Sequence, residues 1–118
     1  MNIETLRNYC LSKKGTTEGF PFDETILVFK VMNKIFAFTN LEGNLSVSLK
    51  CDPELAIALR EEYSFVVPGY HLNKQHWNTI YIEDFVADQL VEQWIDHSYD
   101  LIVKSLPKKL QLELESTT

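Results

Sequence analysis

The chain has 118 residues, of which 45% are apolar and 24% are charged. This length and composition are ordinary for one soluble globular domain, and they exclude a disordered chain. No apolar run approaches the ~20 residues that a membrane-spanning helix needs, so a membrane protein is excluded too. The formal net charge of −6 opposes nucleic-acid binding unless positive and negative side chains lie on different faces.

The N-terminal part is predicted to form a helix followed by a loop. Residues 2–14 have apolar side chains at helical spacing, Asn2 is a suitable N-cap, and Gly15 suits a helix end. The next segment, Thr16–Asp23, contains glycine, proline and two phenylalanines. We expect it to be a loop with apolar anchors.

Three strands are predicted next, over Thr25–Val31, Lys34–Asn40 and Leu45–Lys50. The connections at residues 32–33 and 42–44 are short enough for hairpin turns, so the strands should form an antiparallel meander. Strict alternation along the second strand places Ile35, Ala37 and Thr39 on one face and Phe36, Phe38 and Asn40 on the other.

The second half of the chain is predicted to begin with a helix, because Asp52 is a good N-cap and proline follows it. This helix should end near Tyr63, and residues 66–69 should end in a turn. The remaining predicted elements are a strand over His76–Glu83, a long amphipathic helix over 87–105, a short helix over Lys108–Leu114 and a flexible tail over about 114–118.

The two cysteines, Cys10 and Cys51, both lie in apolar segments. No Cys-x-x-Cys pair is present, so neither zinc binding nor redox catalysis is indicated. We expect two free, buried thiols, which fits a reducing compartment. The first residues also lack the pattern of a signal peptide. These features predict a cytoplasmic protein.

Residues 68–79 are the most informative segment, because they combine aromatic and imidazole groups with amides and a lysine. Aromatic groups can stack on bases, amides can recognise base edges, and lysine can contact a phosphate. The candidates for such contacts are Tyr70, Asn73, Lys74, Gln75, His76, Trp77 and Asn78. In the alternative interpretation the aromatic groups belong to the core. Trp77 occupies a strand position, and we expect it to anchor that strand.

The sequence contains no recognisable catalytic motif. His71 and His76 lie five residues apart across a predicted loop-to-strand junction, and His97 is on the long helix. Neither an HExxH motif nor a glycine-rich phosphate loop is present. We therefore expect no enzymatic activity, no cofactor and no metal site.

Four acids of the long helix recur at a spacing of four residues, namely Asp88, Glu92, Asp96 and Asp100. Like charges at this spacing repel one another weakly. We interpret the row as a solvated face, and weak cation binding is the alternative.

Two blocks of the sequence are distinctive. Residues 68–79 contain Pro-Gly-Tyr-His followed by Lys-x-His-Trp-Asn, and residues 96–101 read Asp-His-Ser-Tyr-Asp-Leu. With the segments 22–31, 49–53 and 106–109, these blocks make the chain similar to the MmcQ/YjbR family from about residue 2 to 113. The resemblance implies one α+β domain over residues 1–118. Its antiparallel β-sheet would be packed on one face by the N- and C-terminal helices, as in the bacterial frataxin homologue.

The resemblance also implies a DNA-binding module with a "double wing", in which β-hairpins and loops approach double-stranded DNA. We expect this module to be non-enzymatic and monomeric. By position, the matching residues are Lys50, Lys74, His76, Trp77 and Asn78, and the basic residues Lys30 and Lys34 extend this surface. Two alternatives stay open. One is a protein- or small-ligand-binding module that uses the 68–79 loop, and the other is a weak frataxin-like metal binder that uses the acidic row.

Overall fold

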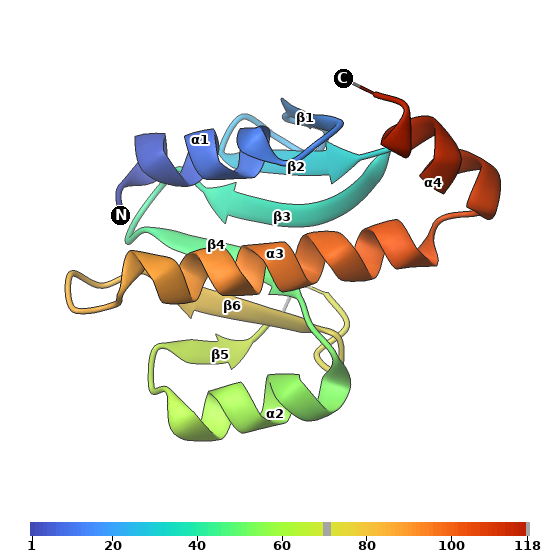
Figure 1. The fold of residues 1–118 in the computed structure, drawn as a ribbon. Helices are drawn as coiled ribbons and strands as arrows, with labels where there is room; N and C mark the ends of the chain where they lie inside the picture. The colour runs from blue at the N-terminus through green and yellow to red at the C-terminus, as the bar shows by residue number, and fades with distance from the viewer. Residues whose placement is uncertain (70–71, 118) are drawn as a thin grey trace.

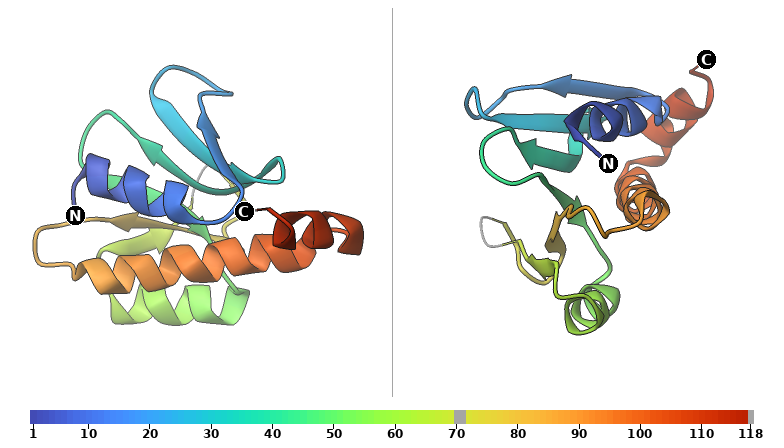
Figure 2. Two further views of the ribbon diagram at one scale, coloured as in Figure 1. Left: turned by 45° about the horizontal axis from the view of Figure 1, so that its top comes forward. Right: turned by 90° about the vertical axis from the view of Figure 1, so that its left-hand side faces the viewer.

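A computed structural model describes residues 1–69 and 72–117 and contains one six-stranded antiparallel sheet (Figure 1). The strand order is β1-β2-β3-β4-β6-β5, and the helices lie on one side of the sheet (Figure 2). The predicted α+β fold, with helices on one face, is therefore confirmed. The elements are α1 (Ile3–Ser12), β1 (Thr16–Gly19), β2 (Ile26–Val31), β3 (Lys34–Asn40), β4 (Ser46–Lys50), α2 (Pro53–Glu62), β5 (Val66–Pro68), β6 (Trp77–Tyr81), α3 (Asp88–Ser105) and α4 (Lys108–Glu115).

Local sequence signals account for the starts of two helices and for one hairpin. The Asn2 side chain accepts a hydrogen bond from the Thr5 backbone N–H, and the Asp52 carboxylate accepts one from the N–H of Leu55. The turn between β2 and β3 has positive φ at both central residues, Met32 (48°) and Asn33 (69°). This is the turn geometry that matches the twist of a two-residue hairpin.

The sequence prediction misses both edge strands. Thr16–Asp23 was expected to be a loop, yet its first four residues pair with β2, and Val66–Pro68 pairs with β6. Both strands are short, and β1 consists of Thr-Thr-Glu-Gly, which has no apolar alternation. Their extended shape comes from backbone hydrogen bonds to a neighbouring strand, and such pairing leaves little signal in the local sequence.

Strict alternation along β3 is wrong, because the register between β2 and β3 shifts at Phe36. The extra residue forms a β-bulge, which reverses the direction of all later side chains. Phe36 and Ala37 are consequently both fully buried on the helical side of the sheet. Ile35 and Phe38, which alternation assigned to opposite faces, lie together on the other side.

Ser98 of α3 holds this bulge in place. Its hydroxyl donates to the carbonyl oxygen of Phe36 (2.5 Å) and accepts from the backbone N–H of Lys50 (2.9 Å). A fully buried helix side chain thus bonds to the backbones of both β3 and β4. The neighbouring Tyr99 ring packs edge-on against the Phe36 ring at a centroid distance of 5.3 Å. The long helix therefore sets the side-chain pattern of the sheet beneath it.

The acidic row of α3 is only partly the solvated face that the sequence suggests. The Asp96 carboxylate accepts hydrogen bonds from the Tyr9 hydroxyl in α1 (2.7 Å) and from the ammonium group of Lys13, which directly follows α1 (2.8 Å). Burial, together with Asp96, raises the pKa of Tyr9 above its ordinary value. The carboxylate of Asp88 contacts the amino group of Met1. These two acids attach α1 to α3.

The C-terminal region is ordered further than the sequence indicates. Helix α4 ends at Glu115, and Leu114, where a flexible tail was expected to begin, is buried. Its side chain packs over Gly15, which has a φ of +72°. The last residue of the predicted tail, Thr118, is outside the described residues.

The Ser98 bridge yields a stability prediction. Replacing Ser98 with alanine leaves a buried carbonyl and a buried N–H without their partner, so we expect the free energy of unfolding to fall by about 1–3 kcal/mol. Urea denaturation followed by circular dichroism measures this change. Ser105→Ala is the matched control, because the exposed Ser105 hydroxyl bonds only to a carbonyl within its own helix, that of Ile102. Equal losses in both variants would contradict the role of the bridge.

A second prediction concerns the cysteines, which are free and buried as expected. Burial raises the pKa of the Cys10 thiol to about 12 and, with a contribution from Asp52, that of Cys51 to about 11. Both thiols should resist Ellman's reagent at pH 8 in the native protein and react fully in urea. The raised pKa values mean that the folded state favours the neutral thiols. Because unfolded thiols ionise near pH 9, their contribution to the free energy of unfolding should be complete below pH 9 and should decline as the pH rises towards 12. Rapid native labelling would contradict the prediction.

Candidate functional site

The candidate site lies on the face of the sheet that carries no helix, seen from its edge in Figure 2. We call this side the open face. The six strands contain three lysines (Lys30, Lys34 and Lys50) and one acid, Glu18. The Glu18 carboxylate forms an ion pair with Arg7 of α1, and so it points to the helical side. The strands are thus basic, although the whole chain is acidic.

A hollow of about 460 Å³ occupies the open face. We call it the open-face hollow. Its floor comes from β2, β3 and β6. Its walls come from Phe22, in the loop between β1 and β2, and from Leu72, between β5 and β6. The lining is almost entirely apolar and consists of Phe22, Ile26, Ile35, Phe38, Leu72 and Trp77.

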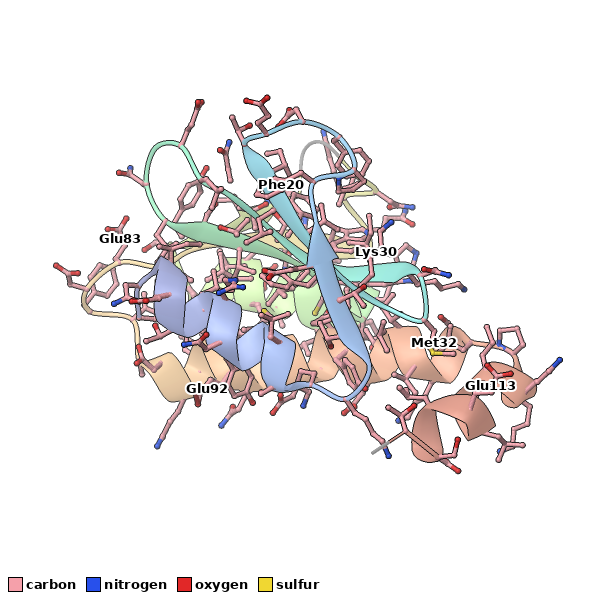
Figure 3. The ribbon with its side chains drawn as sticks, turned by 90° about the horizontal axis from the view of Figure 1, so that it is seen from above. Phe20, Lys30, Met32, Glu83, Glu92 and Glu113 are labelled. Atoms are coloured by element: carbon pink, nitrogen blue, oxygen red, sulfur yellow. The ribbon has the colours of Figure 1, made fainter. Side chains whose placement is uncertain are left out.

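Several of the large apolar groups around the hollow are exposed. Phe22 is 66% exposed and the neighbouring Phe20 is 51% exposed. Figure 3 labels Phe20 and Lys30 on the side of the sheet opposite Glu92, which belongs to α3. The rings of Phe38 and Trp77 lie 6.0 Å apart at an angle of 40°. A contiguous apolar patch of this kind marks a binding site more often than an ordinary surface.

Two lysines flank the hollow. Lys30 pairs across the β2–β3 ladder with Ile35, and Lys50 pairs across the β4–β6 ladder with Trp77. Directly paired residues of antiparallel strands project to the same face, so both ammonium groups lie on the open face beside hollow residues. The face therefore combines apolar and aromatic groups with positive charge.

The other two predicted lysines lie elsewhere. Lys34 is exposed at the hairpin end of β3 and pairs with Val31, whose side chain is buried on the helical side. Lys74 lines a separate hollow beside α2, and its carbonyl accepts a hydrogen bond from Arg60 (2.8 Å). The four lysines consequently do not form one surface.

The structure corrects the expected positions of Trp77 and Asn78. Trp77 is half-buried and lines the open-face hollow, so it is not the core anchor that its strand position suggested. Asn78, which was expected at the contact surface, is 1% exposed, and its amide donates to the carbonyl of Ala56 (3.3 Å). Adjacent strand residues face opposite sides, so only one of this pair can reach the open face.

The two histidines within the described residues, His76 and His97, do not combine into a catalytic or metal site. His97 accepts a hydrogen bond from the Asp52 backbone N–H (3.2 Å), which fixes α3 to the start of α2. His76 is half-buried, and its carbonyl accepts from the N–H of Cys51 (2.7 Å). Among residues 1–69 and 72–117 no three His, Cys, Asp or Glu side chains are grouped to hold a metal ion. Tyr70 and His71, two members of the sequence block, lie outside these residues.

Sequence reasoning missed five of the six hollow residues, all except Trp77. Phe22 carried a recognisable signal, since a phenylalanine in a loop next to glycine and proline is an unusual choice. Ile35 and Phe38 carried no such signal. Their spacing in the sequence assigns them to opposite faces, and the β-bulge at Phe36 places them on the same face. Ile26 is in β2 and Leu72 lies between β5 and β6, so only the tertiary structure brings them to the same hollow.

Gly69 controls the position of Trp77. A Cβ atom at Gly69 would lie 2.9 Å from the Trp77 Cβ and 3.1 Å from its carbonyl oxygen, and the Gly69 N–H bonds to that oxygen (2.8 Å). We expect Gly69→Ala to lower the free energy of unfolding by about 1–3 kcal/mol through overpacking. The indole ¹H–¹⁵N signal of Trp77 should shift while that of Trp94 stays in place. Gly19→Ala is the control, because nothing lies within 4 Å of its added methyl group. An unmoved Trp77 signal would refute this constraint.

Similarity to known sequences covers nearly the whole chain. The model of the YjbR family matches residues 11–101. The chain is 37% identical over 110 residues to the uncharacterised protein YjbR of Escherichia coli K12, an alignment that covers 92% of this chain and 93% of that relative. It is 32% identical over 109 residues to the uncharacterised protein YbdF of Escherichia coli O157:H7, covering 92% and 89%.

The fold is similar to solved structures as well. A Deinococcus radiodurans protein, DR2400, whose domain is described as DUF419, has a TM-score of 0.89 and 36% identity, covering 97% of this chain and 88% of that one. A Pseudomonas syringae protein has a TM-score of 0.73 and 25% identity, covering 86% and 98%. Sequence blocks, fold and full-length similarity all agree: the chain belongs to the YjbR family.

Proposed function

We propose that the protein is a non-enzymatic DNA-binding module whose contact surface is the open face of the sheet. The observation that carries this proposal is the segregation of charge. Lys30 and Lys50 lie on the open face beside exposed aromatic groups, whereas the one acidic strand residue is paired with Arg7 on the helical side. Phosphate contacts supply most of the affinity in such complexes.

Charge segregation also answers the objection raised by the net charge of −6. The four acids of α3 lie on a helix that covers the opposite side of the sheet, and two of them contact α1 or Met1. DNA at the open face would contact Lys30 and Lys50, and the exposed Asp23 and Glu24 of the 20–25 loop flank the same face. At physiological salt, charges more than about 8 Å away are largely screened. The acids behind the sheet would then weaken binding only slightly.

The shape of the open face supports the same proposal. Two exposed apolar side chains flank the face, namely Phe22 in the loop between β1 and β2 and Leu72 between β5 and β6. Hairpin loops on both sides of a basic surface allow contacts to DNA at more than one point.

A small-ligand-binding module is the second candidate, and the hollow itself favours it. Its volume of about 460 Å³ is within the 300–1,000 Å³ range of small-molecule sites, and its lining is apolar. The ligand would have an apolar body and an anionic group able to reach Lys30 or Lys50. Such binding would depend much less on salt than DNA binding does.

The proposal predicts the effect of removing the two open-face lysines. Fluorescence anisotropy with a labelled duplex should show binding at 50 mM salt that weakens at higher salt. In Lys30→Gln/Lys50→Gln, binding should weaken, and the slope of log K against log salt should fall by about 2, since each lost phosphate contact contributes about 0.9.

The control for this experiment is Lys104→Gln/Lys108→Gln, which removes the same charge from α3 and α4 on the helical side. It should change binding little. An equal loss in both double variants would mean that only net charge matters. A folded protein that binds no DNA at 50 mM salt would refute the proposal.

A further inference from the structure

We infer that the open-face hollow receives an unstacked base, so that the protein binds DNA as a single strand in preference to a duplex. This inference rests on the proposed function and specifies its substrate. In a duplex the apolar faces of the bases are stacked on one another, and a protein meets only phosphates and base edges. A hollow lined by six apolar side chains is not complementary to phosphates or base edges, which are charged or polar. A single strand, by contrast, presents base faces that bind aromatic side chains.

The aromatic groups around the hollow come from three separate elements. Trp77 begins β6, Phe38 lies in β3, and Phe22 lies in the loop between β1 and β2. The rings of Trp77 and Phe38 are tilted by 40° relative to each other, so they do not stack face to face. Trp77 is half-buried and Phe22 is 66% exposed, which leaves parts of both rings available to a ligand. Stacking of this kind tolerates any base, because every base has an apolar face.

The lysines are placed to hold the phosphates on either side of such a base. Lys30 is on β2 and Lys50 is on β4, so β3 lies between them, and the register places Ile35 beside Lys30 with Phe38 further along the strand. Adjacent strands are about 4.8 Å apart, which separates the two lysine backbones by roughly 10 Å across the sheet. A strand of DNA that crosses β2, β3 and β4 would put its backbone near both ammonium groups while a base enters the hollow.

A hydrogen-bonded pair of hydroxyl groups lies next to the Phe38 ring. Ser48 pairs with Phe38 across the β3–β4 ladder, and its hydroxyl bonds to that of Thr79 (2.8 Å). Each hydroxyl oxygen has acceptor capacity beyond this bond. Ser48 is only 6% exposed, so the half-buried Thr79 is the member of this pair that the edge of a bound base can reach. The open face is thus complementary to the bases and phosphates of a single strand in polarity and charge.

The test compares a labelled 12-nucleotide single strand with a duplex that contains the same strand, both measured by anisotropy at 50 mM salt. The single strand should bind more tightly, and it should quench the fluorescence of Trp77. The Trp77→Phe variant, which keeps an aromatic ring, should lose this quenching but retain binding. Trp94, which is 8% exposed, should contribute little to the change.

Phe22→Ala is the decisive variant, because a side chain that is 66% exposed can be removed without unfolding the protein. Its affinity for the single strand should fall about 5-fold or more, in line with the loss of one stacked base. Phe85→Ala is the matched control, since Phe85 is 74% exposed and lies in the loop before α3, away from the hollow. It should bind as the unmodified protein does.

The outcomes separate the inference from the function on which it rests. Duplex binding that equals or exceeds single-strand binding would overturn the inference and leave DNA binding in place. Unchanged single-strand affinity in Phe22→Ala would overturn it as well. If neither DNA binds at 50 mM salt, both the inference and the proposed function fail.

Discussion

The Ser98 hydroxyl, bonded to the Phe36 carbonyl and to the Lys50 N–H, is the contact on which the rest of the structure depends. It holds the bulge in β3, and the bulge decides which side chains each face of the sheet presents. Without the extra residue, strict alternation would put Phe36 and Phe38 on the same face. With it, one ring packs in the core against Tyr99 and the other lines the open-face hollow. A buried helix hydroxyl therefore shapes a surface on the far side of the sheet.

The two sequence blocks that carry the family resemblance have different structural roles. Residues 96–99 connect α3 to the rest of the fold, because His97 bonds to the start of α2 and Ser98 to the sheet. Within residues 68–79, Gly69, Leu72 and Trp77 instead shape the open face. Gly69 fits against Trp77 only because it has no side chain, and Trp77 then lies in the hollow. One block thus builds the scaffold, and the other contributes to the surface that a partner can reach.

The distribution of charge matters more than its sum. A net charge of −6 describes the whole chain, but the strands hold three lysines and a single, ion-paired acid. Electrostatic potential near a surface depends mainly on charges within a Debye length, so the two sides of the sheet offer different environments. Exposed aromatic groups lie on the basic side. This combination supports both the proposed DNA binding and the inferred preference for unstacked bases, and it makes the open face the part of the molecule to test first.

The sequence by itself determined most of the fold. Caps at Asn2 and Asp52, a two-residue hairpin turn and the apolar stripe of α3 are local signals, and each acts within a few residues. The candidate site was predictable only in part, through Lys30, Lys50 and Trp77. Only the tertiary structure decided which face Phe38 occupies, that Asn78 is buried, and that Phe22 and Leu72 line the same hollow. These outcomes depend on strand pairing, on a bulge held by a distant helix, and on loops far apart in the chain, and no local pattern encodes such contacts.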